Sequence, residues 1–406
     1  MRALNVMQVI VNLDIGGAQE VVRTLSEGLV ESGCPTVVCS FKDGPLRAQI
    51  ERLGIPVEVL PQRRYSILAF PFYVREMLAI RHALVCLVQK YHINVIQTHL
   101  LRSLDFLVAT LRFGTQRPLV FWTVHNYNFR LRPEQLPRFR WLAGAKQAAH
   151  SWLYRRMAHW VNGFIAVSND IEAGIHNTIG PVQEQIVIIS NGVDTRRYQT
   201  TADHSATRRE LGFVKDEILY TVVGTLKEQK GHRYLIEAVA PLIAQTPQLH
   251  ILIVGDGELR GSLEAQVRAA RIEDNVHFLG NRGDVPAILA ASDVFVLPSL
   301  WEGLPMALIE AMASGLPVIA TQVSGSQQVV EQGRSGILVP PGDVAPLRQA
   351  IEDLLGDPER AKLLGKAAQR RIEEAYSARR QAEEHLVLYR REWGKTQVAA
   401  GAQAGK

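Results

Sequence analysis

The chain has 406 residues, of which 47% are hydrophobic and 7% aromatic, a composition that suits large buried cores and two domains. Its formal net charge is +5. Three cysteines, Cys34, Cys39 and Cys86, form no Cys-x-x-Cys pair, which argues against a disulfide framework or a zinc knuckle and favours a reducing, cytoplasmic setting. No stretch reaches the ~18 uncharged apolar residues of a membrane span. The first residues, through Asp14, fit a strand better than a secretory signal.

Short apolar runs alternate with longer amphipathic ones along the chain, as in parallel sheets wrapped by helices. The first half has predicted strands near residues 6–13, 35–40, 57–60, 94–98, 119–124, 163–167 and 186–189. The second half has predicted strands near residues 218–223, 249–254, 275–278, 293–297, 317–320 and 337–339. The sequence therefore predicts an α/β protein with two sets of strands.

A polar break from Arg196 to Ser205 separates the two sets of predicted strands. We expect one domain over residues 1–195 and a second over residues 196–374. The amphipathic stretch 375–393 predicts a terminal helix. Residues 394–406, which end in Gly-Ala-Gln-Ala-Gly-Lys, are expected to be disordered.

Unusual residues follow several predicted strands, where open parallel sheets bind ligands. In the first half they are Gly16 and Gly17, His99, His125, and Asn191 to Asp194; in the second half they are Gly224 to Gly231, Gly255 to Gly257, and Glu302. Because the carboxyl ends of parallel strands share one edge of a sheet, each set marks a crevice. Two facing crevices would make one cleft between the domains.

Glu302 and Glu310 lie in a run whose other residues are mostly apolar. Pro305 suits the first turn of a short helix and Gly315 the position after its last residue, which places Glu310 within the helix. A carboxylate in such surroundings must be paired, protonated or hydrogen-bonded. Its partner is either an internal arginine or backbone amide, or a hydroxyl of a ligand.

The same run resembles the E-x7-E signature of glycosyltransferase family 4, retaining enzymes of the GT-B fold. The residues that carry the resemblance are Pro298, Ser299, Glu302, Gly303, Pro305, Glu310 to Ala313, Gly315 and Pro317 to Ala320. The resemblance is dense over residues 186–345 and sparse but ordered before them. It implies two Rossmann-like domains facing across a cleft, the first binding the acceptor and the second the nucleotide-sugar, with the terminal helix crossing back to the first.

The resemblance also assigns roles to the two acids. Glu310 is expected to bond the ribose hydroxyls of a nucleotide-sugar. Glu302, with the backbone amides of Gly303 and Leu304, is expected to hold the transferred sugar. Glu302 is therefore expected among the catalytic groups as well as among the donor-binding ones.

Lys230 follows the predicted strand 218–223 and matches the lysine of the family motif G-R-L-x-x-x-K-G. The resemblance implies that it neutralises the departing diphosphate, since a preorganised cation stabilises the charge that builds on the leaving oxygen. Thr225 stands where the motif has arginine. Either Lys227 or an arginine from elsewhere replaces it, or donor binding differs. Taken alone, Lys230 reads as an ordinary solvated lysine.

Gly16 and Gly17 open a predicted helix, where backbone amides can approach phosphate or sugar oxygens. The competing interpretation is a tight turn that needs positive φ; the resemblance favours donor binding. His125 matches a histidine that the family places beside the transferred sugar, although a buried histidine at a strand end is more often structural. His99 has no such motif support, and we expect it to be structural.

The segment from Asn275 to Gly280, followed by Asn281 and Arg282, corresponds to the family segment whose backbone reads the nucleobase. The sequence leaves UDP and GDP open. It contains no Asp-x-Asp and no histidines at metal-ligand spacing, so we expect no metal and no cofactor. The resemblance implies transfer with retention of configuration, with the leaving phosphate oxygen taking the acceptor proton.

Residues 126–160 carry seven Arg and Lys against the single Glu134, interleaved with tryptophans. Such a segment suits an anionic membrane surface, where a lipid-linked acceptor would lie, and equally suits a solvated basic helix. No nucleic-acid-binding motif accompanies the charge. We expect a cytoplasmic enzyme, peripheral at the inner membrane face, that builds cell-surface polysaccharide or glycolipid.

Two other functions were weighed against this one. A nicotinamide enzyme is disfavoured because Gly255, Gly257 and Gly261 have spacing one residue too long for the dinucleotide fingerprint. The alternative is a non-catalytic nucleotide-sugar-binding scaffold of the same fold, which Thr225 favours.

Overall fold

The computed structural model describes residues 4–14, 16–60, 70–99, 103–113, 116–125, 143–180, 185–199 and 204–404. The chain forms two compact units. Unit 1 comprises Met1–Gly192 and Ala378–Lys406, and unit 2 comprises Val193–Ser377. These bounds differ by a few residues from the expected 195 and 374, because the chain leaves unit 1 within the turn Asn191 to Asp194.

Unit 1 contains a seven-stranded parallel sheet in the order β3-β2-β1-β4-β5-β6-β7. Its strands are β1 (Val6–Ile10), β2 (Thr36–Ser40), β3 (Val57–Val59), β4 (Val95–His99), β5 (Leu119–Val124), β6 (Gly163–Ala166) and β7 (Ile186–Ile188). Its helices are α1 (Gly17–Glu31), α2 (Leu46–Arg52), α3 (Phe70–Lys90), α4 (Ser103–Ala109), the 3-10 helix η2 (Thr110–Phe113), α5 (Ala143–Ala158), α6 (Asn169–Ile179) and α16 (Ala378–Ala404).

Unit 2 contains a six-stranded parallel sheet in the order β10-β9-β8-β11-β12-β13. Its strands are β8 (Ile218–Val223), β9 (Leu249–Val254), β10 (Val276–Gly280), β11 (Val294–Leu297), β12 (Val318–Thr321) and β13 (Ile337–Val339). Its helices are α7 (Thr195–Tyr198), α8 (His204–Glu210), the 3-10 helix η6 (Glu228–Lys230), α9 (His232–Gln245), α10 (Arg260–Ala270), α11 (Val285–Ala291), α12 (Met306–Ala313), α13 (Ser324–Val329), α14 (Val344–Gly356) and α15 (Pro358–Ala375).

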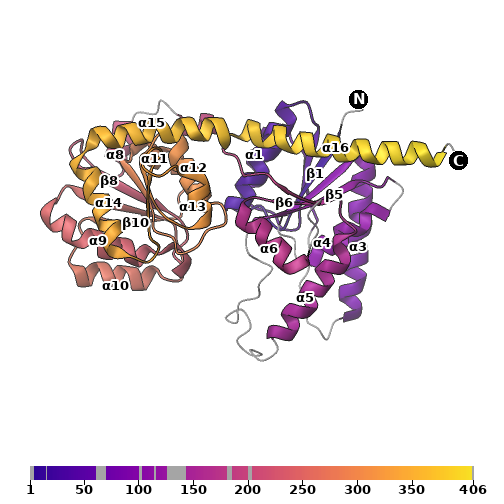
Figure 1. The fold of residues 1–406 in the computed structure, drawn as a ribbon, viewed down its shortest axis with the longest axis horizontal. Helices are drawn as coiled ribbons and strands as arrows, with labels where there is room; N and C mark the ends of the chain where they lie inside the picture. Colours follow the sequence, from indigo (N-terminus) through magenta and orange to yellow (C-terminus); the bar gives the residue numbers. More distant parts are fainter. Residues whose placement is uncertain are drawn as a thin grey trace. The chain divides into compact units, whose positions relative to one another are not determined.

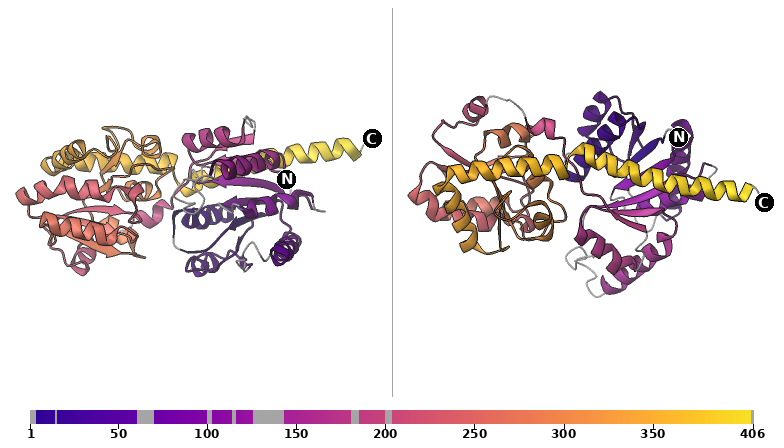
Figure 2. Two further views of the ribbon diagram at one scale, coloured as in Figure 1. Left: turned by 90° about the horizontal axis from the view of Figure 1, so that it is seen from below. Right: turned by 45° about the horizontal axis from the view of Figure 1, so that its top comes forward.

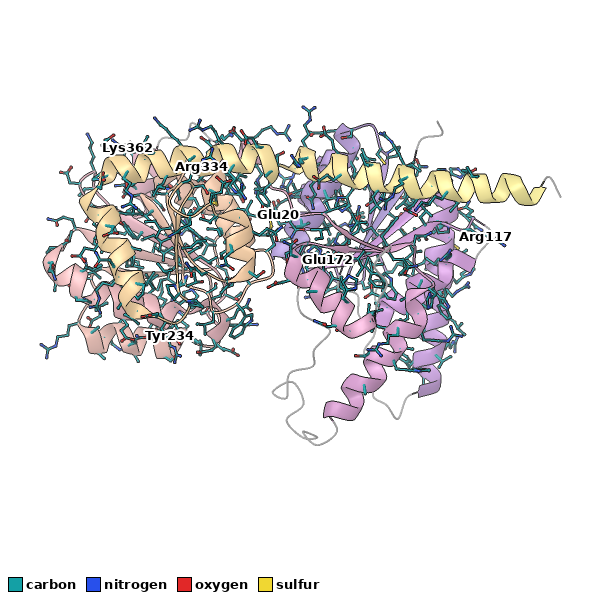
Figure 3. All side chains as sticks on the ribbon, viewed as in Figure 1. Glu20, Arg117, Glu172, Tyr234, Arg334 and Lys362 are labelled. Atoms are coloured by element: carbon teal, nitrogen blue, oxygen red, sulfur yellow. The ribbon has the colours of Figure 1, made fainter. Side chains whose placement is uncertain are left out.

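Each sheet is covered by helices on both faces (Figures 1 and 2). Strands in this position are buried on both sides and read as nearly continuous apolar runs. All thirteen predicted strands are confirmed, most within two residues of their expected ends. Side chains fill the interior of each unit (Figure 3), with the main core of unit 2 built on β8, β9, α9 and α14.

Strand order reverses at the same place in both sheets. In unit 1, β1 pairs with β2 on one side and β4 on the other; in unit 2, β8 pairs with β9 and with β11. The loops that follow β1 and β4, or β8 and β11, therefore leave the sheet in opposite directions and open a crevice. Of the candidate residues, Gly16, Gly17 and His99 follow or end β1 and β4, and Lys230 and Glu302 follow β8 and β11, so these lie beside the two reversal points.

Helix α16 packs on unit 1, as the predicted return of the terminal helix requires. Its residues Ala382, Leu386 and Tyr389 share one core cluster with Leu25 and Leu29 of α1. The prediction of disorder after residue 393 is wrong for residues 394–404, because α16 continues to Ala404. The added segment is rich in alanine, and a helix that is already docked extends without a new nucleation step.

No helix in the described part of the chain is long and apolar enough to cross a membrane.

A close approach between α1 and α16 depends on Gly28. A Cβ added at this position would lie 2.9 Å from the Cβ of Ala382 and 3.2 Å from the carbonyl oxygen of Ala378. Neither contact is with the flexible end of a side chain, so the helices would have to move apart. Gly28 therefore sets how closely α16 lies on α1.

Gly28→Ala is expected to lower the free energy of unfolding of unit 1 by about 1 kcal/mol or more, because overpacking exceeds the gain in helix propensity. Gly261→Ala in α10 is the matched control, since a Cβ there meets nothing within 4 Å. It should stabilise the protein by ~0.5–1 kcal/mol. Urea unfolding measures both changes. Adding Ala382→Gly should offset part of the loss in Gly28→Ala; a Gly28→Ala variant more stable than the native chain would contradict the close approach.

Candidate functional site

Two loops meet at the carboxyl edge of the unit 2 sheet because β8 and β11 are neighbouring strands. The loop after β8 carries Lys230, and the loop after β11 carries Glu302. The Nζ of Lys230 lies 2.7 Å from Oε1 of Glu302. Both side chains are largely buried, with 18% of the lysine and 7% of the glutamate exposed. The structure thus joins two of the predicted site residues in one ion pair.

Neighbouring groups fix the geometry of this pair. The hydroxyl of Ser299 donates to the same Oε1 of Glu302 at 2.6 Å, and Nε2 of Gln229 lies 3.4 Å from Oε2. The backbone amide of Leu300 donates to the carbonyl of Gln229 at 2.7 Å, which links the two loops directly. The carboxylate and the ammonium are therefore held in place rather than left free to rotate.

Gly231 allows the two loops to come this close. It has φ of 64°, a conformation that favours glycine, and a Cβ at this position would lie 2.0 Å from the carbonyl oxygen of Pro298. The side chain of Lys230 also runs over the backbone of Gly224, where a Cβ would meet its Cδ and Cε at 3.4 Å. The glycines of this segment therefore bring the lysine to the glutamate.

The ion pair of Lys230 and Glu302 has hydrogen-bonding positions left over that a ligand can use. An ammonium has three donors and a carboxylate about four acceptor positions. Oε1 of Glu302 receives two bonds, whereas Oε2 receives a single long one from Gln229 among the described residues. Lys230 can thus donate to an anion while Glu302 holds it, and Oε2 can accept from a hydroxyl. Gly303 and Leu304, which follow in the loop, are buried.

Glu310 is not buried among the apolar residues that adjoin it in the sequence. Leu308, Ile309, Ala311 and Met312 are buried, whereas Glu310 is half-buried on α12. Its carboxylate therefore lies on the less buried face of the helix and is not enclosed by its sequence neighbours. A helix turns about 100° per residue, so sequence neighbours point to different faces. Its expected role at the ribose stays a prediction.

The other predicted donor-binding residues of unit 2 lie on exposed loops. Thr225 and Lys227 are exposed, and the carbonyl of Thr225 accepts from the amide of Lys227 at 2.8 Å. Arg282 forms a two-pronged ion pair with Asp284, at 2.8 and 2.6 Å, which lowers the pKa of that carboxyl. Asn281 and Arg282 follow β10 at the edge of the sheet, three strand spacings or roughly 14 Å from β11. They follow a different strand from Lys230, whose loop leaves β8.

In unit 1, Gly16 and Gly17 begin α1 after the first strand, as predicted. Gly16 is extended, with φ of −176°, and Gly17 is not among the glycines with positive φ. The competing interpretation, a turn that requires positive φ, is therefore wrong. The first-turn amides of α1 are open to an anion in principle, and binding stays a prediction.

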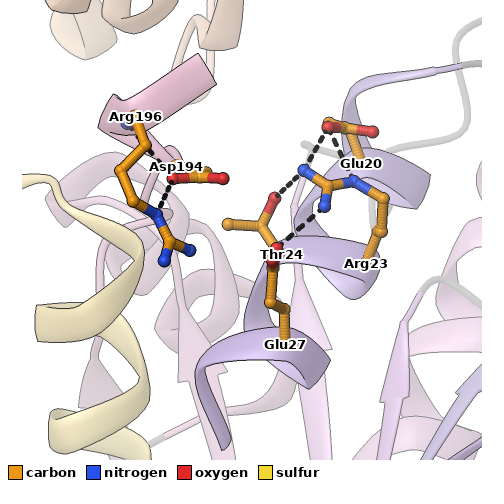
Figure 4. Close-up of polar contacts among 6 residues, drawn as sticks. All are labelled: Glu20, Arg23, Thr24, Glu27, Asp194 and Arg196. Carbon is orange, nitrogen blue, oxygen red and sulfur yellow. Dashed lines mark hydrogen bonds and ion pairs between the residues drawn. The ribbon is translucent and has the colours of Figure 1, made fainter. Parts of the chain in front are cut away.

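Later in α1, Arg23 is buried between two carboxylates (Figure 4). Its guanidinium bonds Glu20 at 2.7 and 2.9 Å and Glu27 at 2.9 Å. Burial acts to lower the pKa of Arg23, but the two carboxylates outweigh it and raise that pKa. The same figure shows Asp194, which caps α7 by accepting from the amide of Arg196 at 3.2 Å. The Asn191 to Asp194 turn thus starts a short helix.

His125 directly follows β5 and is buried, with its Nε2 2.9 Å from Nδ1 of His99. The Nδ1 of His125 has no hydrogen-bond partner within the described residues. Burial lowers the pKa of His125 to about 4. Burial, together with the neighbouring His125 and His385, lowers the pKa of His99 well below its usual range. Both rings are therefore neutral at physiological pH.

The expectation that His99 is structural holds in that both of its ring nitrogens are hydrogen-bonded, Nε2 lying 2.7 Å from Oε1 of Gln8. It is also in direct contact with His125, which the sequence analysis did not foresee. A usable signal was present: Gln8 interrupts the otherwise apolar strand β1, and Gln97 lies in the fully buried strand β4. A buried glutamine requires hydrogen-bond partners, and neighbouring strands supply them.

Ser299, Gln229 and His232 were also missed as site residues. His232 begins α9 beside Lys230, is buried, and both ring nitrogens lack a partner in the described chain. Burial first, and the charge of Lys230 second, lower its pKa to about 4. No spacing rule marks these residues, since their roles depend on which loops meet.

The basic segment 126–160 is described only in part, because residues 126–142 lie outside the described residues. Helix α5 has Trp152 65% exposed and Arg155 and Arg156 exposed. Across the described chain, no group of three or more His, Cys, Asp and Glu is arranged to hold a metal ion. The expectation of a metal-independent reaction is not tested by this.

Two family models match the chain. Residues 15–197 match "Glycosyltransferase Family 4", and residues 203–371 match "Glycosyl transferases group 1". The first covers most of unit 1 and the second most of unit 2. Together they leave only the first strand, a short connection and the C-terminal helix outside the matches.

The chain is similar in sequence to part of the length of several curated relatives. It is 30% identical over 244 residues to the UDP-Gal:alpha-D-GlcNAc-diphosphoundecaprenol alpha-1,3-galactosyltransferase of Escherichia coli, covering 59% of this chain and 61% of that protein. It is 34% identical over 200 residues to the GDP-mannose-dependent monoacylated alpha-(1-6)-phosphatidylinositol monomannoside mannosyltransferase of Corynebacterium glutamicum, covering 47% and 52%. The chain thus matches less than two thirds of either relative.

Solved structures share the whole fold. HepE of Anabaena, in complex with UDP and glucose, superposes with a TM-score of 0.79 at 22% identity, covering 95% of this chain and 99% of that one. Sucrose-phosphate synthase of Thermosynechococcus elongatus superposes with a TM-score of 0.76 at 23% identity, covering 97% and 100%. These likenesses establish the predicted fold class, two Rossmann-like α/β domains of the GT-B type.

The buried histidines predict how stability depends on pH. His125 and His385 each have a pKa lowered by burial from 6.5 to about 4. Between these values the unfolded chain binds protons that the folded chain does not, so stability is complete above pH 6.5 and falls as the pH falls towards 4. Each histidine should remove about 2 kcal/mol between pH 6.5 and 5. Hydrogen exchange of peptides from β1 and β4, corrected for intrinsic rates, measures this loss.

A matched pair of variants assigns the pH effect. His385→Gln should make the free energy of unit 1 less dependent on pH, while His159→Gln, at an exposed position, should leave the dependence unchanged. Equal stability at pH 7 and pH 5 in the native chain would mean that these rings are not buried in neutral form.

Proposed function

This chain belongs to glycosyltransferase family 4, and we propose that it transfers a sugar from a UDP- or GDP-linked donor to a glycan or lipid-linked acceptor, with retention and without a metal. The observation that carries the proposal is the buried pair of Lys230 and Glu302 at the reversal point of the unit 2 sheet. Such a crevice is where open α/β sheets bind nucleotides.

Lys230 is the group that stabilises the negative charge that develops during the reaction. As the bond between the anomeric carbon and the phosphate oxygen breaks, the electron pair and its charge go to the diphosphate. A cation already held in position by Glu302, Ser299 and Gly231 stabilises that charge with little rearrangement, the most effective form of electrostatic catalysis. The ammonium of Lys230 donates to the phosphate with its remaining hydrogens.

The other site residues position the two substrates. Oε2 of Glu302 and the amides of Gly303 and Leu304 hold the sugar, Glu310 bonds the ribose, and the end of β10 with Asn281 and Arg282 receives the base. Gly16 and Gly17 approach the donor phosphates, and His125 contacts the sugar. The acceptor oxygen forms its bond on the face from which the diphosphate leaves, and a phosphate oxygen takes the acceptor proton. No metal enters any step.

The named relatives support the substrate classes without choosing among them. One relative uses UDP-Gal and another GDP-mannose, so the proposal includes both UDP-linked and GDP-linked donors. Both names also include a lipid-linked acceptor. HepE was solved with UDP and glucose. We infer a role in cell-surface polysaccharide or glycolipid synthesis. Lys227, exposed in the loop of Lys230, is our candidate for replacing the motif arginine that Thr225 lacks.

We also propose that the enzyme works in the cytoplasm, peripheral at the inner face of the membrane. The exposed Trp152 with Arg155 and Arg156 on α5 supports this, because basic residues with an exposed tryptophan suit anionic headgroups. A non-catalytic scaffold of the same fold is the second candidate, favoured by Thr225.

Lys230→Met should reduce release of sugar from UDP- or GDP-sugars by about 10²–10³-fold, because a preorganised donor is lost. It also leaves Glu302 buried and unpaired, at a cost of about 3–5 kcal/mol in stability. The double variant Lys230→Met/Glu302→Gln should recover much of the stability but none of the activity. Lys362→Met, on the surface of α15 (Figure 3), is the control and should match the native chain.

The assay is donor hydrolysis with UDP- and GDP-linked glucose, galactose and mannose, beside thermal shifts with UDP and GDP. Binding of a nucleotide-sugar without turnover in the native chain would favour the scaffold. Full activity in Lys230→Met would remove Lys230 from the mechanism.

Membrane contact is expected to show as co-sedimentation with anionic phospholipid vesicles and its loss at high salt. Trp152→Ala/Arg155→Gln/Arg156→Gln should bind at least about 30-fold less, since each of the two basic residues near such a surface contributes about 1 kcal/mol. A control with Arg379→Gln and Arg380→Gln, on exposed positions of α16, should keep native binding. Absence of binding by the native chain at moderate salt would remove the proposal.

A further inference from the structure

A continuous row of buried polar side chains crosses the core of unit 1 from α16 to His125. Its members come from α16, β4, β1 and the end of β5, and all are buried: His385, Tyr389, Gln97, Gln8, His99 and His125. One end of the row is a backbone carbonyl, that of Gln381, which lies 2.8 Å from Nδ1 of His385. The other end is Nδ1 of His125, for which the described residues offer no hydrogen-bond partner.

The carbonyl of Gln381 determines every hydrogen position in the row. A carbonyl oxygen only accepts, so Nδ1 of His385 carries a hydrogen. Burial keeps the ring of His385 neutral by lowering its pKa to about 4, and its Nε2 is therefore an acceptor. The group facing that Nε2, at 3.2 Å, must donate.

That donor is the amide nitrogen of Gln97, which also donates to the hydroxyl of Thr123 at 2.6 Å. The amide oxygen of Gln97 then faces two donors, the hydroxyl of Tyr389 and Nε2 of Gln8, the latter at 3.4 Å. With its nitrogen directed to Gln97, Gln8 has its oxygen towards Nε2 of His99, at 2.7 Å. The amide orientations follow from the row and are not free choices.

The remaining two rings follow by the same rule. His99 must donate from Nε2 to Gln8, and since the ring is neutral its Nδ1 accepts. The nitrogen facing it, Nε2 of His125 at 2.9 Å, must therefore carry a hydrogen. His125 is neutral as well, which leaves a lone pair on its Nδ1.

We propose that α16, acting through Gln97, Gln8 and His99, fixes His125 as a hydrogen-bond acceptor at Nδ1, so that the group it binds is a hydroxyl donor. The row makes His385, Gln97, Gln8 and His99 positioning residues for His125. That the hydroxyl belongs to a sugar rests on the proposed function; the tautomer itself does not.

An acceptor at this position discriminates between ligands. A ligand hydroxyl satisfies the buried nitrogen, whereas a methoxy group leaves it unpaired. The cost of an unsatisfied buried group is about 1–3 kcal/mol, or roughly 5- to 150-fold in affinity. A histidine free to exchange tautomers would not discriminate in this way, because it could donate to an ether oxygen.

The direct test is the nitrogen-15 NMR spectrum of the ligand-free chain labelled at histidine ring nitrogens, near pH 7. We expect hydrogens on Nε2 of His125, Nε2 of His99 and Nδ1 of His385. Loss of one set of signals in each of His125→Asn, His99→Asn and His385→Asn assigns the spectrum. A hydrogen on Nδ1 of His125, or a charged ring, overturns the proposal whether or not the chain transfers sugar.

Two variants distinguish an effect of the row on the His125 tautomer from general damage to the core. Gln8→Met removes the link between Gln97 and His99, so His125 should become a mixture of tautomers. Tyr389→Phe removes a hydrogen bond to the same Gln97 oxygen without interrupting the row, and His125 should keep its native signals. If Gln8→Met folds and also keeps the native signals of His125, the row does not set the tautomer and the proposal fails.

Discussion

The arrangement of this molecule depends on one constraint: parallel strands end at a common edge, and only where strand order reverses do adjacent loops part to leave room for a ligand. Both sheets reverse at the same point in their order, between β1 and β4 and between β8 and β11. Lys230 and Glu302 lie 72 positions apart in the chain, yet their loops leave neighbouring strands. The common edge of parallel strands also brings together His99, at the end of β4, and His125, just after the neighbouring strand β5. The topology of each sheet thus determines which loops, and therefore which side chains, come together.

The pairing of Lys230 with Glu302 shows how a buried charge is kept available. Removing two ions from water costs several kcal/mol each, and their attraction offsets that cost only with good geometry and further hydrogen bonds. Ser299 and Gln229 supply those bonds to the carboxylate. What remains is a mostly buried lysine with hydrogen-bond donors that Glu302 does not use. A pair of this kind contributes little net stability, which makes a role towards an anionic ligand the better explanation for its presence.

Much of the fold was predictable because a strand buried on both faces is mostly apolar. Each such strand can therefore be recognised in the sequence as a short apolar run. The resemblance to a family named the candidate site residues one by one, but it did not predict their contacts. No pattern in the sequence reveals that Lys230 binds Glu302, since that contact depends on the close approach of Gly231 to Pro298. Glu310 lies within a helix, as predicted, but its burial was overestimated because neighbours in sequence point to different faces of a helix. The extent of α16 was underestimated because residues 394–406 were expected to be disordered as a chain terminus, although the docked helix continues through them to Ala404.

Helix α16 contributes both to the apolar core of unit 1 and to its row of buried polar side chains. Its apolar face supplies Leu386 and Tyr389 to the core of unit 1, and Gly28 lets it lie close enough to α1 for His385 to reach the sheet. A helix held only by apolar contacts would have no need of a buried histidine, because leucine would pack there at no cost in desolvation. The polar row that begins at Gln381 is therefore not explained by apolar packing alone. Because every member is neutral and most of their hydrogen-bonding groups are satisfied, the row transmits orientation rather than charge. The returning helix thus acts on His125 by deciding which of its nitrogens carries the hydrogen.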